Sequence, residues 1–329
     1  MAGVTVIAEA GVNHNGEMHL AKRLIDEARE AGADFVKFQT ATNPTSKYAP
    51  KAEYQERETG GGSQLEMALK LRLTLDQHRE LYEYCNQVGI SYLSTAFDIE
   101  SVRFLNSLDL PFWKIPSGEI TNLPYLLEIA RTNKPIVMST GMAEMSEISD
   151  ALSILRENGA GDITLLQCHT DYPTMMKDVN LRAMYTLRDA FGLPFGLSDH
   201  SIGIEASIAA VGMGATVIEK HFTLDRRMVG PDHKASIEPC ELRELVDSIR
   251  NVELALGDGC KECSEVERKN VVVARKSIVA KRGIVKGEIF TEDNITTRRP
   301  GSGVSPMKWF EVLGTKATRD FDEDELICL

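Results

Sequence analysis

Short apolar runs alternate with amphipathic segments along the first 257 residues. Segments with apolar residues at helical spacing, and with Gly near their C-terminal ends, predict helices over 19–33, 75–89, 147–161 and 241–257. Eight runs rich in β-branched or aromatic residues predict strands over 4–12, 34–40, 90–97, 112–118, 135–141, 163–170, 194–201 and 216–223. Eight strand–helix repeats predict an α/β fold, a (β/α)8 TIM barrel over residues 1–257.

An open, doubly wound parallel sheet is the main alternative for alternating strands and helices. That fold is expected to carry a G-x-G-x-x-G turn after its first strand. The turn at 11–17 reads GVNHNGE, which lacks this spacing. The pattern therefore favours the barrel.

The pattern changes after residue 257. Residues 258–270 are polar and charged, as is typical of a linker, and short strand-like runs at 271–281 and 295–301 follow with little helix. We expect a small, mainly-β domain over 271–329, and a domain of this size is only marginally stable without a partner surface. In the barrel, the long connection at 43–67 is typical of a lid or substrate loop.

Composition narrows the classes of ligand. The formal net charge of −12 argues against a nucleic-acid or anionic-membrane partner, so any anionic ligand must bind in a local basic pocket. The six cysteines are scattered without a disulfide framework, and Cys260 and Cys263 form the one close pair, so we expect reduced thiols. With no leader-like start and no transmembrane-length apolar run, the sequence favours a cytoplasmic location.

Each predicted strand ends in polar residues, at the rim where barrels of this class carry their chemistry. Lys37 and Lys114 are embedded in apolar strands, where an ammonium group is costly to bury without an anion. Together with the strand-end hydroxyl groups they indicate a phosphate or carboxylate pocket. The alternative is a structural ion pair of either lysine with Glu9 or Glu119.

Two histidines occupy matching positions at neighbouring strand ends. His200 and His221 end the seventh and eighth predicted strands, so their imidazoles can face one divalent cation that keeps open positions for substrate or water. Glu9, Glu219 and Asp232 are the acidic candidates for catalysis or for a second shell around the cation. The alternatives are strand-end histidines with ordinary hydrogen bonds, a Glu9 that caps the rim, and an Asp232 that belongs to a loop turn.

Ordered motifs extend from one end of the chain to the other. They include AEAGVNHNG (8–16), VKFQT (36–40), WKIPSGE (113–119), STGM (139–142), SDHSIG (198–203), VIEKHFTLD (217–225), GPDHKASIEP (230–239) and, in the tail, ARKSIVAK and KGEIFTEDNITTRRPGSGVSP. These motifs resemble the sialic acid synthases, which condense phosphoenolpyruvate with an N-acylated amino sugar. The resemblance implies a (β/α)8 barrel, a C-terminal antifreeze-like (SAF, β-clip) domain, and a homodimer in which the C-terminal domains are swapped.

The same resemblance implies roles for individual residues. His200 and His221 would bind a divalent ion, most often manganese, with magnesium or cobalt as alternatives. The phosphate and carboxylate of phosphoenolpyruvate would be bound by Lys37, Thr95, Lys114, Ser117, Ser139 and Ser198. Glu9, Asp232 and His221 would act beside the aldehyde, Glu219, Thr170 and Tyr172 would line the sugar side, and Arg299 would reach the N-acyl group from the partner subunit.

The activity implied first is N-acetylneuraminate synthase, which joins phosphoenolpyruvate, N-acetylmannosamine and water to give N-acetylneuraminate and phosphate. An alternative within the enzymes is a synthase for a related nonulosonate such as N,N′-diacetyllegionaminate, which uses a 6-deoxy sugar with two N-acetyl groups. Thr170 stands where many members of the family have Asn, which changes the contacts on the sugar side. Outside the enzymes, the alternative is an inactive carbohydrate-binding homologue.

Overall fold

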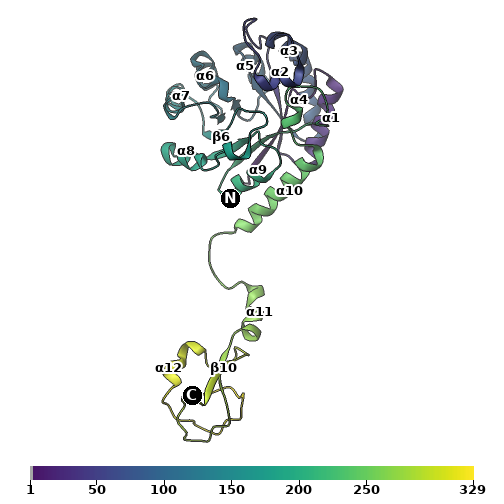
Figure 1. Ribbon diagram of the computed structural model, residues 1–329. Coiled ribbons are helices and arrows are strands. Elements are labelled where there is room, and N and C mark those ends of the chain that lie inside the picture. The colour runs from purple at the N-terminus through teal and green to yellow at the C-terminus, as the bar shows by residue number, and fades with distance from the viewer. Residues whose placement is uncertain (1–2) are drawn as a thin grey trace. The chain divides into compact units, whose positions relative to one another are not determined.

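The computed structural model describes residues 3–329, and the chain divides into two compact units, Met1–Gly257 and Asp258–Leu329. The first unit is a parallel eight-stranded barrel with helices around its outside (Figure 1). Its strands are β1 (Thr5–Gly11), β2 (Phe35–Thr40), β3 (Ser91–Ala96), β4 (Trp113–Ile115), β5 (Ile136–Ser139), β6 (Ile163–Cys168), β7 (Phe195–Asp199) and β8 (Val217–His221). Its helices are α1 (Met18–Glu30), α2 (Glu53–Thr59), α3 (Gln64–Leu71), α4 (Leu75–Val88), α5 (Ile99–Asn106), α6 (Leu123–Ala130), α7 (Met145–Glu157), α8 (Ala183–Phe191), α9 (Glu205–Gly212) and α10 (Pro239–Leu256).

The strand order confirms the predicted barrel. The sheet runs β3-β2-β1-β8-β7-β6-β5-β4, and the ladder between β1 and β8 brings the last strand back to the first. Within residues 3–329 no ladder joins β3 to β4, although the two strands contact each other. The doubly wound alternative is wrong, because such a sheet leaves its first and last strands apart.

Burial on both faces explains why the strands are apolar throughout. All residues of β5, β7 and β8 are buried, as expected for parallel strands with side chains in the barrel on one face and helices on the other. Helix α1 buries one stripe of its surface, through Ala21, Leu24, Ile25 and Ala28 at helical spacing. The polar residues within these strands are therefore buried in a rigid scaffold.

Register brings polar residues of neighbouring strands to the same level of the barrel. Glu9 lies opposite both Lys37 on β2 and His221 on β8, and Ser198 on β7 lies opposite Glu219. Because side chains alternate along a strand, Glu219 and His221 share one face of β8. The carboxyl ends of the strands thus meet at one rim.

The second unit contains α11 (Glu265–Ala274), α12 (Trp309–Val312) and the antiparallel pair β9 (Ser277–Ala280) and β10 (Ile295–Arg298). Its separate small apolar core includes Phe290 and Phe321, and the expected mainly-β domain is confirmed. The strand predicted over 271–281 is confirmed only in β9. Residues 265–274, which include part of the expected linker, are helical because Ser264 and Glu267 form a capping box.

Two expectations from composition can be compared with the structure. All six cysteines are free thiols, and Cys85 and Cys168 are buried. From residue 3 to residue 329, none of the helices combines the length and apolar character that a membrane span requires. The cytoplasmic location remains a prediction.

Candidate active site

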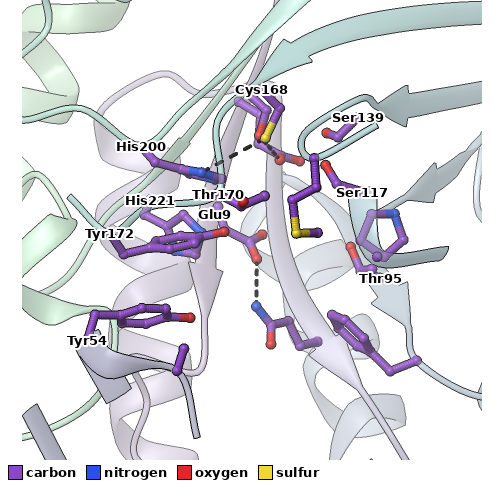
Figure 2. Close-up of a pocket in the computed structure, with 18 of the residues that line it drawn as sticks. Glu9, Tyr54, Thr95, Ser117, Ser139, Cys168, Thr170, Tyr172, His200 and His221 are labelled. Carbon is purple, nitrogen blue, oxygen red and sulfur yellow. Dashed lines mark hydrogen bonds between the residues drawn. The ribbon is translucent and has the colours of Figure 1, made fainter. Parts of the chain in front are cut away.

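A cavity of about 580 Å³ lies at the carboxyl ends of the barrel strands (Figure 2). It is lined by all the predicted site residues except Asp232 and Arg299, namely Glu9, Lys37, Thr95, Lys114, Ser117, Ser139, Thr170, Tyr172, Ser198, His200, Glu219 and His221. Asp232 lines an adjoining cavity that shares His221 with the first. Arg299 is exposed on the second unit, after β10, and its role stays a prediction.

The two sides of the cavity differ in chemistry. Figure 2 shows Tyr172, His200 and His221 together on one side. Across the cavity lie the hydroxyl groups of Thr95, Ser117 and Ser139. The site therefore offers rings and imidazole nitrogens to one end of a ligand and hydroxyl groups to the other.

A buried ion-pair network occupies the floor of the cavity. The Lys37 Nζ atom lies 2.7 Å from Glu9 Oε2 and 3.5 Å from Glu219 Oε2, and it donates a hydrogen bond to Thr95 Oγ1 at 2.8 Å. The alternative pairing of Lys37 with Glu9 is thus present, but it lies within the cavity wall. Charge balance and ligand binding therefore involve the same groups.

Lys114 is less well paired than Lys37. Its Nζ atom lies 3.5 Å from Glu219 Oε1 and 3.4 Å from its hydrogen-bond acceptor, the Ile115 carbonyl oxygen. The alternative pairing of Lys114 with Glu119 is wrong, because the ion pair that Lys114 makes among residues 3–329 is with Glu219. Burial lowers the pKa of Lys114, although Glu219 opposes this shift. A buried, weakly paired ammonium group is the feature expected of an anion site.

The pKa values of the two carboxyl groups of the cavity are shifted in opposite directions. Burial raises the pKa of Glu9 to about 7, partly opposed by Lys37 and reinforced by Glu219. Burial acts on Glu219 in the same direction, but the charges of Lys114 and Lys37 and a hydrogen bond from Ser198 lower its pKa to about 2. Near neutral pH, Glu219 is a fixed negative charge and Glu9 can gain or lose a proton.

The hydroxyl groups differ in the partners they have within the protein. Ser198 Oγ donates to Glu219 Oε1 at 2.8 Å, and Ser117 Oγ accepts from the Gly141 backbone N–H at 2.9 Å. Ser139 Oγ is buried and has no hydrogen-bond partner in the part of the chain that the structure describes. Because buried hydroxyl groups are normally satisfied, Ser139 indicates a ligand oxygen at this wall.

The geometry of the imidazole pair suits ligation. The ring centroids of His200 and His221 are 5.3 Å apart. His200 Nδ1 donates to the His169 carbonyl oxygen at 2.5 Å, so in the neutral ring the lone pair lies on Nε2. Burial acts to lower the pKa of His200, but the neighbouring Cys168 and the His169 carbonyl group raise it. Burial, with the nearby His200 and Lys37, lowers the pKa of His221 far below its usual value, so the His221 ring is neutral.

The protein provides only part of the coordination shell that a bound cation would need. Among residues 3–329 no three His, Cys, Asp or Glu side chains are grouped to bind a metal ion. The His200–His221 pair offers two nitrogen ligands. Asp232 Oδ2 lies 3.9 Å from His221 Nδ1, which is too long for a hydrogen bond, and this nitrogen is buried without a hydrogen-bond partner among residues 3–329. A divalent ion here would need substrate or water for its other positions.

Several lining residues were missed by the sequence reasoning. The expected substrate loop supplies Tyr54, whose ring stacks on Tyr172 with centroids 4.9 Å apart, and Tyr172 stacks on His200 at 4.2 Å. The length of the 43–67 connection indicated a substrate loop but no single residue in it. Gln39, whose Nε2 donates to Glu9 Oε1 at 3.3 Å, carried a clearer signal as a strand-end amide.

Gly11 gives the end of β1 a left-handed backbone conformation beside side chains of the site. Gly11 has φ +52, and a Cβ atom there would lie 3.3 Å from His221 Cε1 and 3.4 Å from both Glu9 Oε1 and Gln39 Nε2. The left-handed conformation and the close approach both favour glycine. The close packing of three side chains of the site therefore favours glycine at the end of β1.

Comparison with known proteins identifies the family. A family model described as the NeuB family matches residues 24–261. The chain belongs to the NeuB family. A SAF domain model matches residues 275–328, so both parts of the resemblance inferred from the sequence motifs are confirmed.

Relatives within the NeuB family include enzymes for different nine-carbon sugars. An N,N′-diacetyllegionaminic acid synthase from Campylobacter jejuni subsp. jejuni serotype O:2 is 55% identical over 99% of this chain and 99% of its own length. An enzyme of the same name from Legionella pneumophila subsp. pneumophila is 45% identical over 94% of this chain and 89% of its own. The crystal structure of an N-acetylneuraminic acid synthetase from Leptospira borgpetersenii serovar Hardjo-bovis, in complex with citrate, superposes with a TM-score of 0.72 at 34% identity, covering 82% of this chain and 90% of that one.

Proposed function

We propose that this protein is an N,N′-diacetyllegionaminate synthase, which condenses phosphoenolpyruvate with a 6-deoxy sugar carrying two acetamido groups. Two N,N′-diacetyllegionaminic acid synthases are 55% and 45% identical to this chain, whereas the N-acetylneuraminic acid synthetase of known structure is 34% identical. These identities favour the alternative considered above over N-acetylneuraminate synthase. The observation that best supports this reaction is that the weakly paired Lys114 lines the same cavity as Lys37, Glu9 and the imidazole pair.

The lysine side of the cavity suits the enol phosphate. Lys37 and Lys114 provide positive charge, and the unpartnered Ser139 hydroxyl provides a hydrogen bond to a phosphate or carboxylate oxygen. When Glu9 is protonated, the two ammonium groups outnumber the single ionised carboxylate of Glu219, so the floor of the cavity attracts an anion. This local excess of positive charge supports the binding of a multiply charged anion by an acidic protein.

The reaction forms one carbon–carbon bond and replaces the carbon–oxygen bond of the enol phosphate by one to the oxygen of water. The double-bond electrons of phosphoenolpyruvate form a bond from carbon 3 to the aldehyde carbon, and the aldehyde oxygen takes a proton. Water then adds at carbon 2 and loses a proton. Phosphate leaves with its bridging oxygen and takes up the proton of the new hydroxyl group, which gives the 2-keto acid. Glu9, with a pKa of about 7, is placed to accept the proton of this water.

The imidazole pair would bind a divalent ion in this scheme, manganese being the expected one. Such an ion supplies Lewis-acid chemistry, which polarises the aldehyde. His200 and His221 would provide two nitrogen ligands. We expect Mn²⁺ titration, followed by electron paramagnetic resonance, to show one binding site in the wild type and none in His200→Ala; equal binding by both proteins would exclude this site.

Phosphate release tests the proposed function. With phosphoenolpyruvate and a panel of amino sugars, we expect release to require both substrates and to be fastest with the 6-deoxy, di-N-acetylated sugar. Replacing Lys114 by Met should raise the KM for phosphoenolpyruvate about tenfold or more, because a charge-assisted hydrogen bond is lost. Lys134→Met is the matched control, since Lys134 pairs with Asp109 away from the cavity. Absence of release with every sugar would instead support an inactive carbohydrate-binding homologue.

A further inference from the structure

A second cavity of about 280 Å³ adjoins the first one. The two cavities share several lining residues, which are Gln39, Tyr54, Gln55, Gln64, Phe97, Tyr172 and His221. Because the same side chains line both, a ligand with one end beside His221 can extend from the first cavity into the second. Of the residues that line only the second cavity, Asp232 alone is a predicted catalytic residue, and the reaction steps described above use none of the others.

The second cavity has a different chemistry from the first. Seven of its ten unshared lining residues are apolar, namely Val12, Ala41, Pro44, Met67, Ala68, Leu71 and Pro231, and the other three are Thr45, Arg72 and Asp232. Met67, Ala68 and Leu71 come from α3, which begins within the long connection at 43–67 that was predicted to contact substrate. This cavity suits methyl groups better than it suits a phosphate or a carboxylate.

Amide groups lie where the two cavities meet. Gln55 and Gln64 line both, and in the described part of the chain the side-chain hydrogen bond of Gln64 uses its oxygen, which accepts from Thr45 Oγ1 at 3.3 Å. The NH₂ group of Gln64 is therefore available to a ligand carbonyl oxygen. An acetamido group, with one methyl, one carbonyl and one N–H, matches an aliphatic cavity with amides at its entrance.

We infer that the second cavity, which is lined in part by α3, binds the second acetamido group and the terminal methyl group of the sugar. These are the two features that distinguish the 6-deoxy, di-N-acetylated sugar from N-acetylmannosamine. The acetamido group adds a methyl group to its polar amide, and the terminal methyl group is less polar than the hydroxymethyl group that it replaces. Met67, Ala68 and Leu71 contact the methyl groups, and Gln64 donates to the acetamido carbonyl oxygen. This inference rests on the proposed function and makes α3 the helix that determines sugar specificity.

Two substitutions on α3 test the inference. Met67→Gln keeps the length of the side chain but adds a polar group, and Ala68→Leu fills the cavity. For each, we expect kcat/KM for the di-N-acetylated sugar to fall about tenfold or more, the range that a hydrophobic pocket can discriminate. The value for N-acetylmannosamine and the KM for phosphoenolpyruvate should remain near those of the wild type. Leu69→Gln is the matched control, because Leu69 lies on the same helix, is exposed, and lines neither cavity.

The outcomes separate the two proposals. If folded Met67→Gln and Ala68→Leu proteins keep the wild-type ratio of kcat/KM for the two sugars, or lose both activities equally, the assignment of the cavity is wrong while the proposed function stands. If the wild type does not turn over the di-N-acetylated sugar, the proposed function itself is wrong. A ratio that changes in both α3 variants and not in Leu69→Gln supports the inference.

Discussion

Glu9 and Glu219 show how neighbouring strands assign different roles to the same side-chain type. Both carboxyl groups are buried, but Glu219 lies within 3.5 Å of both lysines and accepts from Ser198, whereas Glu9 has its close ion pair with Lys37 alone. Position at a strand end predicted that both residues belong to the site. It did not predict their pKa values, which depend on distances between side chains from five strands.

Replacing Glu9 by Gln tests its role as a proton acceptor. Because Glu9 must be ionised to accept a proton, and burial raises its pKa to about 7, wild-type kcat should rise with pH through neutrality. Glu9→Gln should lower kcat by about 10²–10⁴-fold and remove this rise, as measured by phosphate release across pH. The exposed Glu80, which pairs with Lys22, gives Glu80→Gln as control. An unchanged pH profile in Glu9→Gln would assign the proton transfer to another group.

At the scale of elements, a buried ion pair joins β7 and β8 to α9. Lys220 Nζ lies 2.8 Å from Asp199 Oδ2, which also accepts from Ser207 Oγ on α9. These residues directly precede His221 and His200, so the pair fixes the strands that carry both imidazoles. The sequence predicted these strands because their apolar runs are strong. It did not predict α2, α3 and α11, which lie in polar segments and begin at local caps.

Removing one partner of this pair should be costly. We expect Asp199→Ala to lower the free energy of unfolding by about 3–5 kcal/mol, because it leaves the ammonium group of Lys220 buried and unpaired. The double variant Asp199→Leu/Lys220→Met should recover part of the loss. Glu128→Ala, which breaks the exposed Arg103–Glu128 pair, should cost about 0–1 kcal/mol. Denaturant titration measures all three, and equal costs for the two single variants would contradict this role.

For the whole molecule, the sequence pattern predicted the architecture more fully than it predicted the substrate. Eight buried strands and two compact units follow from hydrophobic periodicity and from the change in pattern after residue 257. The choice of sugar depends on a few groups, such as Met67 and Gln64, that long-range packing brings beside the rim. No local pattern specifies such packing, and identity to relatives was needed to choose between two sugars.

Global stability should depend on pH through buried neutral histidines. Burial lowers the pKa of His14 to about 4, of His78 to about 3 and of His233 to about 4, from 6.5. Below pH 6.5 the unfolded chain binds protons that the folded chain does not, so their contribution to stability is complete above pH 6.5 and is lost as the pH falls towards 4.

The variant His78→Gln isolates one of these histidines. It should reduce the slope of unfolding free energy against pH by up to about 1.4 kcal/mol per pH unit between pH 6.5 and 4, which corresponds to one proton. Glu9 and Asp232, whose pKa values burial raises, act in the opposite direction but do so equally in both proteins. Denaturant titrations at several pH values measure the slopes. Identical slopes in the two proteins would show that burial does not keep His78 neutral.

Arg299 tests the predicted contribution of the second unit. If a swapped partner subunit brings Arg299 to the N-acyl group, Arg299→Ala should mainly raise the KM for the sugar and leave the KM for phosphoenolpyruvate unchanged. Arg319→Ala is a suitable control, because Arg319 pairs with Glu325 within the second unit. An unchanged sugar KM in Arg299→Ala would remove this unit from the site.

A competition experiment tests the central claim most directly. The purified protein receives phosphoenolpyruvate and equal concentrations of N-acetylmannosamine and the 6-deoxy, di-N-acetylated sugar, and mass spectrometry quantifies the two nine-carbon products. Their initial ratio equals the ratio of the two kcat/KM values. We predict that N,N′-diacetyllegionaminate predominates; a predominance of N-acetylneuraminate, or the absence of both products, would contradict the account.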